Sequence, residues 1–477
     1  MTTSAWELGE ILGTFLCAVL CVGFIFYKLL IKQARLSSSL FLIFTTGITF
    51  FYTLLLLQLP LNYIVFYCRV AAVLFLYYLI YTTIRAKWTF KNRLIPLLIS
   101  GTLLSATLLL AKNYLKVIIY HPIMDWDARS IWYFRAKQLL HNNGFSEQMG
   151  ICSGDCFTSF SHAFYSFMVP GISAFLSSGM GIWNEFLPKA NLTILLIGLI
   201  LALISLKHIN ILFRILMFVA LISINPNMLI NGYLDAWLGI FHVITMLFLC
   251  EYIRTLRKEY IYSCMSSLIF VNYIKNEGGL LVTCLLVSSI FILYFTSGKK
   301  FLLYTLGRIF QIKYLLLLNI IPFILWTIYK MVYNYYSIDY DVSQLYNLNV
   351  WVTFFTSEKF KLMYNYLIEQ SNYLTLLVAC LFTGLICLWY MVLNKYSNIT
   401  FYSMLAILTI PILTSGLFFL AICTVYYTSL IDIEWHLMTS ADRLREHLIY
   451  MAIIPLFYSL YTIKLFPFSK IKFFASR

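Results

Sequence analysis

Charged residues are scarce in this chain. Only 11% of its 477 residues are Asp, Glu, Lys or Arg, whereas a soluble globular domain carries roughly 25%. Hydrophobic residues make up 61%, and apolar runs of roughly 20 residues, enough to cross about 30 Å of hydrocarbon, recur along almost the whole length. The composition excludes a soluble globular protein and predicts an integral membrane protein with many spans.

Acidic residues are scarcer than basic ones, with 19 Asp and Glu against 34 Lys and Arg. The net charge of +15 would suit nucleic acid if the basic residues formed one continuous face. They stand instead in short clusters beside the apolar runs, as in the cytoplasmic loops of membrane proteins. We therefore expect membrane lipids as partners and no nucleic acid.

A cleavable signal peptide is not evident. The first apolar run lacks a basic segment before it, and Lys28, Lys32 and Arg35 follow it where a small-residue cleavage site would stand. We expect this run to stay as an anchor. Nine of the 11 cysteines lie in apolar runs, while Cys152 and Cys156 stand in a polar loop, where they would form a disulfide in an oxidising compartment.

The basic clusters orient the expected spans. Because Lys and Arg favour the cytoplasmic side, the first span ends inside and the amino terminus lies outside. Spans are expected at 11–32, 38–58, 63–84, 93–112, 190–206, 209–229, 234–252, 258–273, 278–296, 313–334, 373–394, 399–427 and 446–466. The predicted fold is all-α, a polytopic transmembrane helical bundle of about thirteen spans with its carboxyl terminus inside. Residues 1–477 form a single domain.

Three long segments fall outside in this topology, at about 113–188, 335–370 and 428–445. The longest should carry short interfacial helices. Within it, residues 160–180 are apolar but interrupted by Pro170 and Gly171. We expect a helix there that lies at or dips into the outer interface.

The polar clusters also fall on the outer side. They comprise residues 121–129, 231–235, 275–278 and 434–443. Asp125 and Asp127 stand two apart, and in an extended segment both carboxylates would point to one face and share a divalent cation or divide the roles of base and anchor. Solvated loop acids are the plainer interpretation.

Lys275 and Glu277 lie near the outer end of a span, where charges are costly unless they are paired or face a wet cavity. A simple outer turn is the alternative. Asp235 opens another span, where an acid is often only a helix cap. Together these residues predict a charged site at the outer face.

Before the last span, Thr439 and Asp442 resemble a capping box, which predicts that a helix begins there. Its free amides would bind an anion, and Arg443 would add a planar fork suited to phosphate. Arg443 and His447 are four apart, on one face of that helix. A salt-bridged helix end is the plainer interpretation.

Three features together resemble the GT-C superfamily of integral membrane glycosyltransferases, which includes protein mannosyltransferases and aminoarabinose transferases. They are an aspartate in a large outer loop, Lys275-Asn276-Glu277-Gly278, and Trp435-His436-Leu437-x-Thr439-Ser440-x-Asp442-Arg443-Leu444. The resemblance covers about residues 110–460. It implies inverting transfer of a sugar from a polyprenyl-phosphate donor to a lipid- or protein-linked glycan acceptor at the outer face of the membrane. The high content of Lys, Asn, Ile, Phe and Tyr and the lack of an evident targeting signal favour a bacterial inner membrane, with the site facing the periplasm.

The resemblance also implies roles for individual residues. Asp127 would be the general base, with Asp125 as the alternative or a metal ligand. Lys275, Arg443 and His436 would hold the donor phosphate. Supporting positions are Arg129, Asp235, Glu277, Asp442 and His447. Metal dependence stays open, and Mg²⁺ or Mn²⁺ is the cation that Asp125 and Asp127 would bind. One departure is that several spans precede the key acid, which many members of the family place after the first span.

Two other functions stay open. A polyprenyl-diphosphate-linked glycan ligase or polymerase would share the same outer site. A lipid flippase or transporter would need charges near the middle of the membrane, and most of the spans expected here lack charge at their centres.

Overall fold

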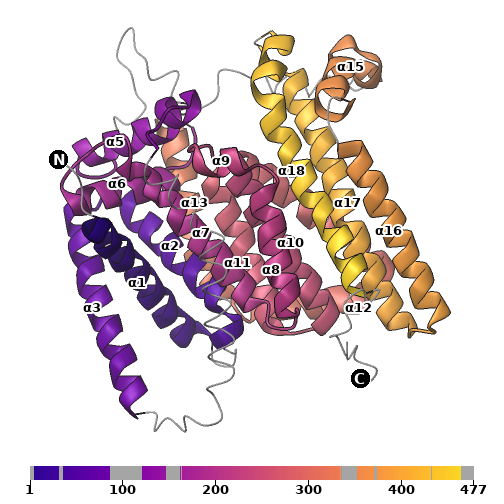
Figure 1. Ribbon diagram of the computed structural model, residues 1–477, viewed down its shortest axis with the longest axis horizontal. Helices are drawn as coiled ribbons and strands as arrows, with labels where there is room; N and C mark the ends of the chain where they lie inside the picture. The colour runs from indigo at the N-terminus through magenta and orange to yellow at the C-terminus, as the bar shows by residue number, and fades with distance from the viewer. Residues whose placement is uncertain are drawn as a thin grey trace.

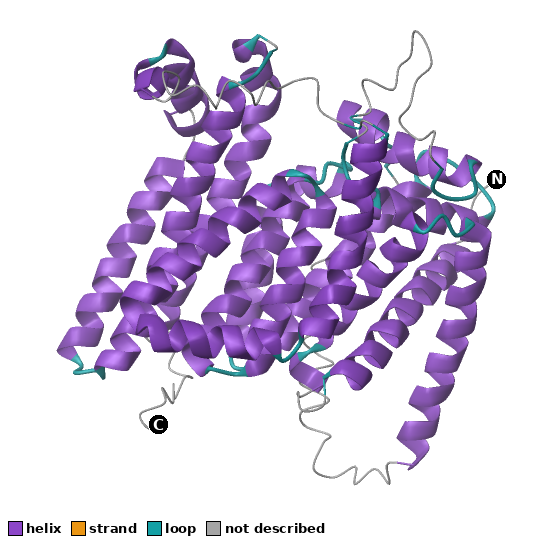
Figure 2. Cartoon of the chain, turned by 180° about the vertical axis from the view of Figure 1, so that it is seen from behind, coloured by secondary structure: helices purple, strands orange, loops and turns teal. Residues whose placement is uncertain are grey.

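The computed structural model describes residues 5–31, 36–85, 121–146, 162, 164–333, 335, 352–369, 373–430 and 432–462. Over these ranges the chain is helical almost throughout and contains no strand. The all-α prediction is confirmed. The long helices form a bundle whose connections gather at its two ends (Figures 1 and 2).

Each expected span within the described residues overlaps a helix, although several helix ends differ from the expected bounds. Their bounds are α1 (Ala5–Leu30), α2 (Leu40–Leu56), α3 (Leu61–Arg85), α5 (Phe134–His141), α6 (Met168–Met180), α7 (Asn191–Ser205), α8 (Ile211–Ser223), α9 (Pro226–Ile230), α10 (Asp235–Thr255), α11 (Lys258–Ile274), α12 (Glu277–Phe310), α13 (Lys313–Val332), α15 (Glu358–Tyr364), α16 (Tyr373–Leu393), α17 (Asn398–Tyr427) and α18 (Ile433–Thr462). The span expected at 93–112, Cys152, Cys156 and most of 335–370 lie outside the described residues.

Eight of the described helices are long and apolar enough to cross a membrane. They are α1, α3, α10, α12, α13, α16, α17 and the continuous stretch Leu187–Ser205, in which the 3₁₀-helix η5 (Leu187–Ala190) leads into α7. The apolar α8 has 13 residues, which cover about 20 Å, less than the roughly 30 Å of a bilayer core. The chain therefore has the multi-pass helical character of a membrane protein, and the count of about thirteen spans stays a prediction.

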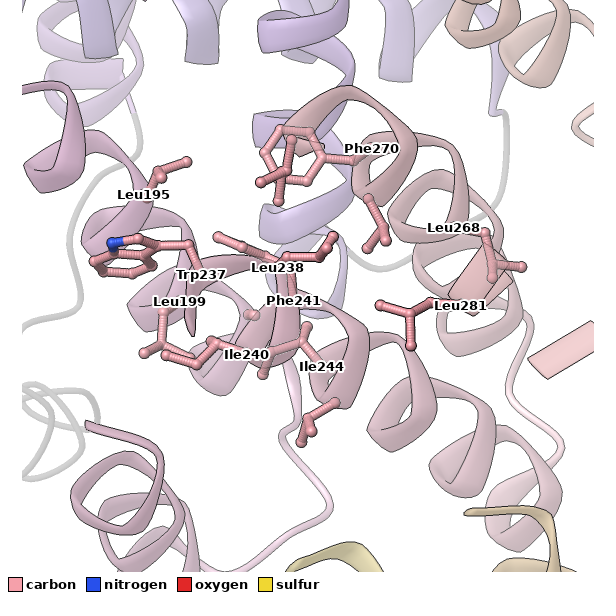
Figure 3. Close-up of a cluster of buried hydrophobic side chains, with 14 of the residues drawn as sticks. Leu195, Leu199, Trp237, Leu238, Ile240, Phe241, Ile244, Leu268, Phe270 and Leu281 are labelled. Atoms are coloured by element: carbon pink, nitrogen blue, oxygen red, sulfur yellow. The ribbon is translucent and has the colours of Figure 1, made fainter. Parts of the chain in front are cut away.

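Helix α10 lies at the centre of the bundle. The apolar stretch of this candidate span is entirely buried, because α7, α11, α17 and α18 surround it. Figure 3 shows Trp237 and Phe241 of α10 packed among Leu195, Phe270 and other apolar side chains. This packing fixes the first residue of α10, Asp235, at one end of the bundle.

The direction of the central helices separates two ends of the molecule. Helix α10 runs from Asp235 to Arg254, α11 returns from Lys258, and α12 starts again at Glu277. Asp235 and Glu277 therefore lie at one end, here named the cluster end. Arg254 and Lys258 lie at the other, here named the basic end.

Helix α12 bends at Gly298. Its φ of 79° is a backbone conformation that glycine adopts without strain. After the bend, Thr305 bonds to Tyr252 at 3.1 Å and Gln311 accepts a bond from Tyr262 at 2.9 Å. Both tyrosines lie near the basic ends of α10 and α11, so the second part of α12 runs across the basic end. The sequence predicted only a loop there.

Helix α6 differs from the expected interfacial helix. Its residues Met168 to Ser177 are all buried, and it packs against α1, α3 and α5. Other helices therefore cover it, and its position relative to the membrane interface stays a prediction. The polar residues within this apolar segment, Ser173 and Ser177, are buried with it, and Ser173 donates to the Pro188 carbonyl at 3.0 Å.

Candidate functional site

Five charged side chains from four segments meet at the cluster end. They are Asp127, Asp235, Lys275, Glu277 and Arg443, here named the charged cluster. Asp127 precedes the short π-helix η3 (Ala128–Tyr133), and Arg443 belongs to α18. The sequence named all five as site residues. The structure brings them together in two linked sets of ion pairs.

Lys275 is the buried centre of the first set. Its Nζ lies 2.7 Å from Asp235 Oδ1 and 3.0 Å from Glu277 Oε1, and only 7% of its side chain is exposed. Burial alone would lower the pKa of Lys275, but the Asp235 and Glu277 carboxylates outweigh it and raise that pKa above its usual range. Lys275 is therefore a fixed positive charge held between two acids.

Tyr165 covers this set of ion pairs. Its hydroxyl donates to Glu277 Oε1 at 3.2 Å, and its ring lies 5.7 Å from Lys275 Nζ. Burial, together with the charges of Glu277 and Asp235, raises the pKa of Tyr165 well above its usual range. The phenol thus stays protonated and donates.

Arg135 of α5 fixes the segment that carries Tyr165. It donates to the carbonyls of Tyr165 and His162, each at 2.7 Å, and stacks on Phe167 at 4.3 Å. Sequence reasoning missed both Arg135 and Tyr165 as site residues. The signal in the sequence was Arg135, which stands among the aromatic residues that follow Asp127. An arginine buried there needs several hydrogen-bond acceptors, and this would have pointed to a structured site.

Asp127 and Arg443 form the second set. Their carboxylate and guanidinium are ion-paired, with 22% and 19% of the side chains exposed. The guanidinium carbon lies 5.3 Å from the Tyr233 ring centre. Burial alone would lower the pKa of Arg443, and Asp235 and Asp127 raise it. The side chains of Arg443 and Asp127 are thus more accessible than that of Lys275.

The extended geometry expected for Asp125 and Asp127 is wrong. The chain becomes helical at Trp126, and Asp127 has helical angles of −63° and −34°. Residues two apart in a helix point in different directions. The helix forms here because Trp132 and Tyr133 are buried against the bundle, a packing effect that the local spacing does not reveal. Over the described residues, no three His, Cys, Asp or Glu side chains converge as metal ligands would.

The capping box expected at Thr439 is also wrong. Helix α18 begins at Ile433, and the Asp432 carboxylate accepts the Trp435 amide at 2.9 Å. Thr439 lies inside the helix and donates to the carbonyls of Trp435 and His436. The free amides of α18 therefore lie near residues 433–435, more than one turn before Arg443.

The remaining predicted residues lie around the cluster. The ring Nδ1 of His436 lies 3.0 Å from the Ser429 hydroxyl, two turns before Arg443 on α18. Asp442 points outward, 73% exposed, and pairs with Arg445 at 2.7 Å. Arg129 is exposed, and the backbone carbonyl of Asp125 accepts its amide at 3.0 Å. His447 is buried beneath the cluster, beside Gly239 of α10.

Comparison of the chain with protein-family models, curated proteins and solved structures finds no match. The function is therefore argued from the geometry of the charged cluster.

Proposed function

We propose that the charged cluster is the active site of an inverting glycosyltransferase in a bacterial inner membrane. It would move a sugar from a polyprenyl-phosphate donor to a lipid- or protein-linked glycan acceptor, with the cluster end facing the periplasm. The observation that carries the proposal is the ion pair of Asp127 and Arg443. A candidate base and a candidate phosphate ligand meet at the accessible part of the cluster.

Asp127 is the proposed general base. The donor phosphate competes for Arg443, whose planar fork suits phosphate oxygens, and so releases the Asp127 carboxylate. Asp127 then accepts the proton of the acceptor hydroxyl. The acceptor oxygen forms the new bond to the anomeric carbon from the face opposite the leaving phosphate. The bond between that carbon and the phosphate oxygen breaks, and its electron pair departs with the polyprenyl phosphate.

The cations have different proposed roles. Arg443 contacts the phosphate, while Lys275 acts through its field, because Asp235 and Glu277 already occupy its ammonium group. A fixed charge near a developing anion stabilises the transition state without reorganisation. His436 lies two turns from Arg443, about 10 Å along the helix, so it suits a more distant part of the donor. Asp125 remains the alternative base.

The charge balance supports a monophosphate donor. Arg443 is the more exposed of the two cations of the cluster, and a polyprenyl-phosphate sugar carries one negative charge on its phosphodiester. A diphosphate-linked glycan, the donor of a ligase or polymerase, brings more charge and would need further cations. Mg²⁺ or Mn²⁺ would supply that charge if Asp125 or Asp127 turned to bind it.

The position of charge along α10 supports an enzyme over a transporter or flippase. Between Asp235 at the cluster end and Glu251 near the basic end, α10 carries no Asp, Glu, Lys or Arg. Charges that bind a transported ion or polar substrate commonly lie near mid-membrane. The central helix here concentrates its acids at its two ends.

The test compares the purified wild type with Asp127→Asn in turnover of polyprenyl-phosphate sugars, with varied acceptors and with or without EDTA. Glu358→Gln is the matched control, because Glu358 is an exposed acid outside the charged cluster. Loss of turnover in Asp127→Asn alone, with folding intact, supports the assignment, and EDTA sensitivity adds a metal. An unaffected Asp127→Asn beside an active wild type eliminates Asp127 as the base and moves the search to Asp125, Asp235 and Glu277.

A further inference from the structure

Two buried histidines lie beneath the charged cluster, His242 on α10 and His447 on α18. His242 and His447 are each 1% exposed. None of their four ring nitrogens has a hydrogen-bond partner among the described residues, and neither has Asp235 Oδ2. Five buried polar atoms without partners thus occur in one region of the bundle.

These atoms follow one line down the helix interface. Asp235, Gly239 and His242 are spaced four and three apart, so they share one face of α10. Arg443 and His447 are four apart on α18. Gly239 gives His447 the room to approach, because a Cβ built at Gly239 would lie 3.3 Å from His447 Nδ1 and 2.6 Å from Tyr450 Cδ2. The line begins at the charged cluster and leads into the bundle.

The imidazoles need hydrogen-bond partners. A neutral histidine has one donor and one acceptor, and leaving both unsatisfied in a low-dielectric interior is costly. Native proteins fill such sites with ordered water that makes two to four bonds to polar groups. Polar side chains inside a membrane protein commonly face such hydrated cavities.

We propose that ordered water molecules occupy the α10–α18 interface and hydrogen-bond to His447, His242 and Asp235 Oδ2. This water site extends the charged cluster inward. It satisfies the second carboxylate oxygen of Asp235 while the first binds Lys275 at 2.7 Å. The water thereby holds Asp235 in the orientation that pairs it with Lys275.

The water site is closed at its inner end. His242 lies seven residues beyond Asp235, about 10 Å along the helix, which is about a third of the hydrocarbon thickness. The next acid on α10, Glu251, is already satisfied by Arg254 at 2.6 Å and by the Tyr458 hydroxyl at 3.0 Å. Water at the histidines therefore does not connect the two ends of the molecule.

X-ray hydroxyl-radical footprinting of the full-length wild type tests the water. Internal water becomes radicals that oxidise the side chains touching it. Tyr450, which packs at Gly239, should be oxidised at least fivefold faster than Tyr252, an equally buried tyrosine that bonds to Thr305. In a His242→Leu/His447→Leu variant, Tyr450 oxidation should fall to the level of Tyr252. Equal, low oxidation of both tyrosines in the wild type overturns the proposal.

Thermal unfolding gives a second measurement. If the interface is dry, replacing an unsatisfied imidazole by an apolar side chain removes a cost, and His447→Phe raises Tm. If water satisfies the ring, the substitution removes those bonds and lowers Tm by a few degrees, as we expect.

Vesicles loaded with a pH-sensitive dye should show no proton flux, and a flux would overturn the closed inner end. None of these measurements requires turnover, so they are independent of the transferase proposal.

Discussion

Arg443 and Asp127 are 316 residues apart in the chain and form an ion pair at the cluster end of the bundle. The pair joins the segment before α5 to the first turns of α18. It also joins two groups that have opposite tasks in the proposed reaction, because one binds the phosphate and the other removes a proton. The stability of the fold and the proposed catalysis therefore depend on the same two side chains in different ways.

Exchanging the two charges separates their effect on stability from their effect on catalysis. Asp127→Arg and Arg443→Asp each place like charges together and should lower stability, while the double variant should regain about 1–3 kcal/mol of coupling. Turnover should fall at least roughly 100-fold in all three variants, because the base is lost or misplaced. Thermal unfolding and donor turnover measure the two effects. A double variant that recovers turnover would show that the pair is only structural.

Removing the buried cation should be costly. Lys275→Met leaves the carboxylates of Asp235 and Glu277 together without their partner. Breaking a buried ion pair on one side costs about 3–5 kcal/mol, measurable as a fall in Tm in detergent or nanodiscs.

The matched control for Lys275→Met is Lys361→Met. Lys361 pairs with Glu358 at 2.6 Å, but their side chains are 61% and 83% exposed. An exposed pair contributes about 0–1 kcal/mol, so the control should unfold close to the wild type. Equal Tm shifts in both variants would contradict the buried role of Lys275.

The sequence predicted the all-α fold and named all five members of the charged cluster, together with five residues that lie outside it. Apolar runs of spanning length are recognisable because they must cross the hydrocarbon of a membrane. A Lys or an Asp beside such a run needs a partner once the helices pack together. Lys275 and Asp235 are therefore visible in the sequence as costly residues, although nothing in the sequence says that they pair with each other.

Local patterns failed where tertiary packing decides. The extended geometry at Asp125 and the cap at Thr439 were both inferred from short spacings. Asp125 adjoins a helix and Thr439 lies inside one, and the burial of distant aromatic and apolar residues stabilises both helices. Tyr165 was missed because its role depends on Arg135 and Glu277, from two other segments. The helical continuation after Gly298 was missed because a glycine beside Lys299 and Lys300 also suits a loop.

The bend in α12 depends on Gly298. Gly298→Ala forces a side chain into a φ of 79° and should cost about 1–3 kcal/mol. Gly307 lies in the helix after the bend, and nothing lies within 4 Å of a Cβ built there. Gly307→Ala should therefore stabilise the protein by about 0.5–1 kcal/mol. Unfolding of the two variants in parallel measures the difference, and a shift of the same sign in both would contradict the strained bend.

The orientation of the cluster end can be measured by cysteine labelling. We expect Asp442→Cys, at the cluster end, to react with a membrane-impermeant maleimide in right-side-out vesicles, because its side chain is 73% exposed. Lys300→Cys, near the basic end, should react only after permeabilisation, because clustered Lys and Arg residues favour the cytoplasmic side.

The native cysteines set the background, so the wild type and a Cys152→Ser/Cys156→Ser variant are labelled in parallel. Labelling of Lys300→Cys in sealed vesicles, with Asp442→Cys protected, would invert the topology and place the charged cluster in the cytoplasm, where a donor displayed on the outer leaflet cannot reach it.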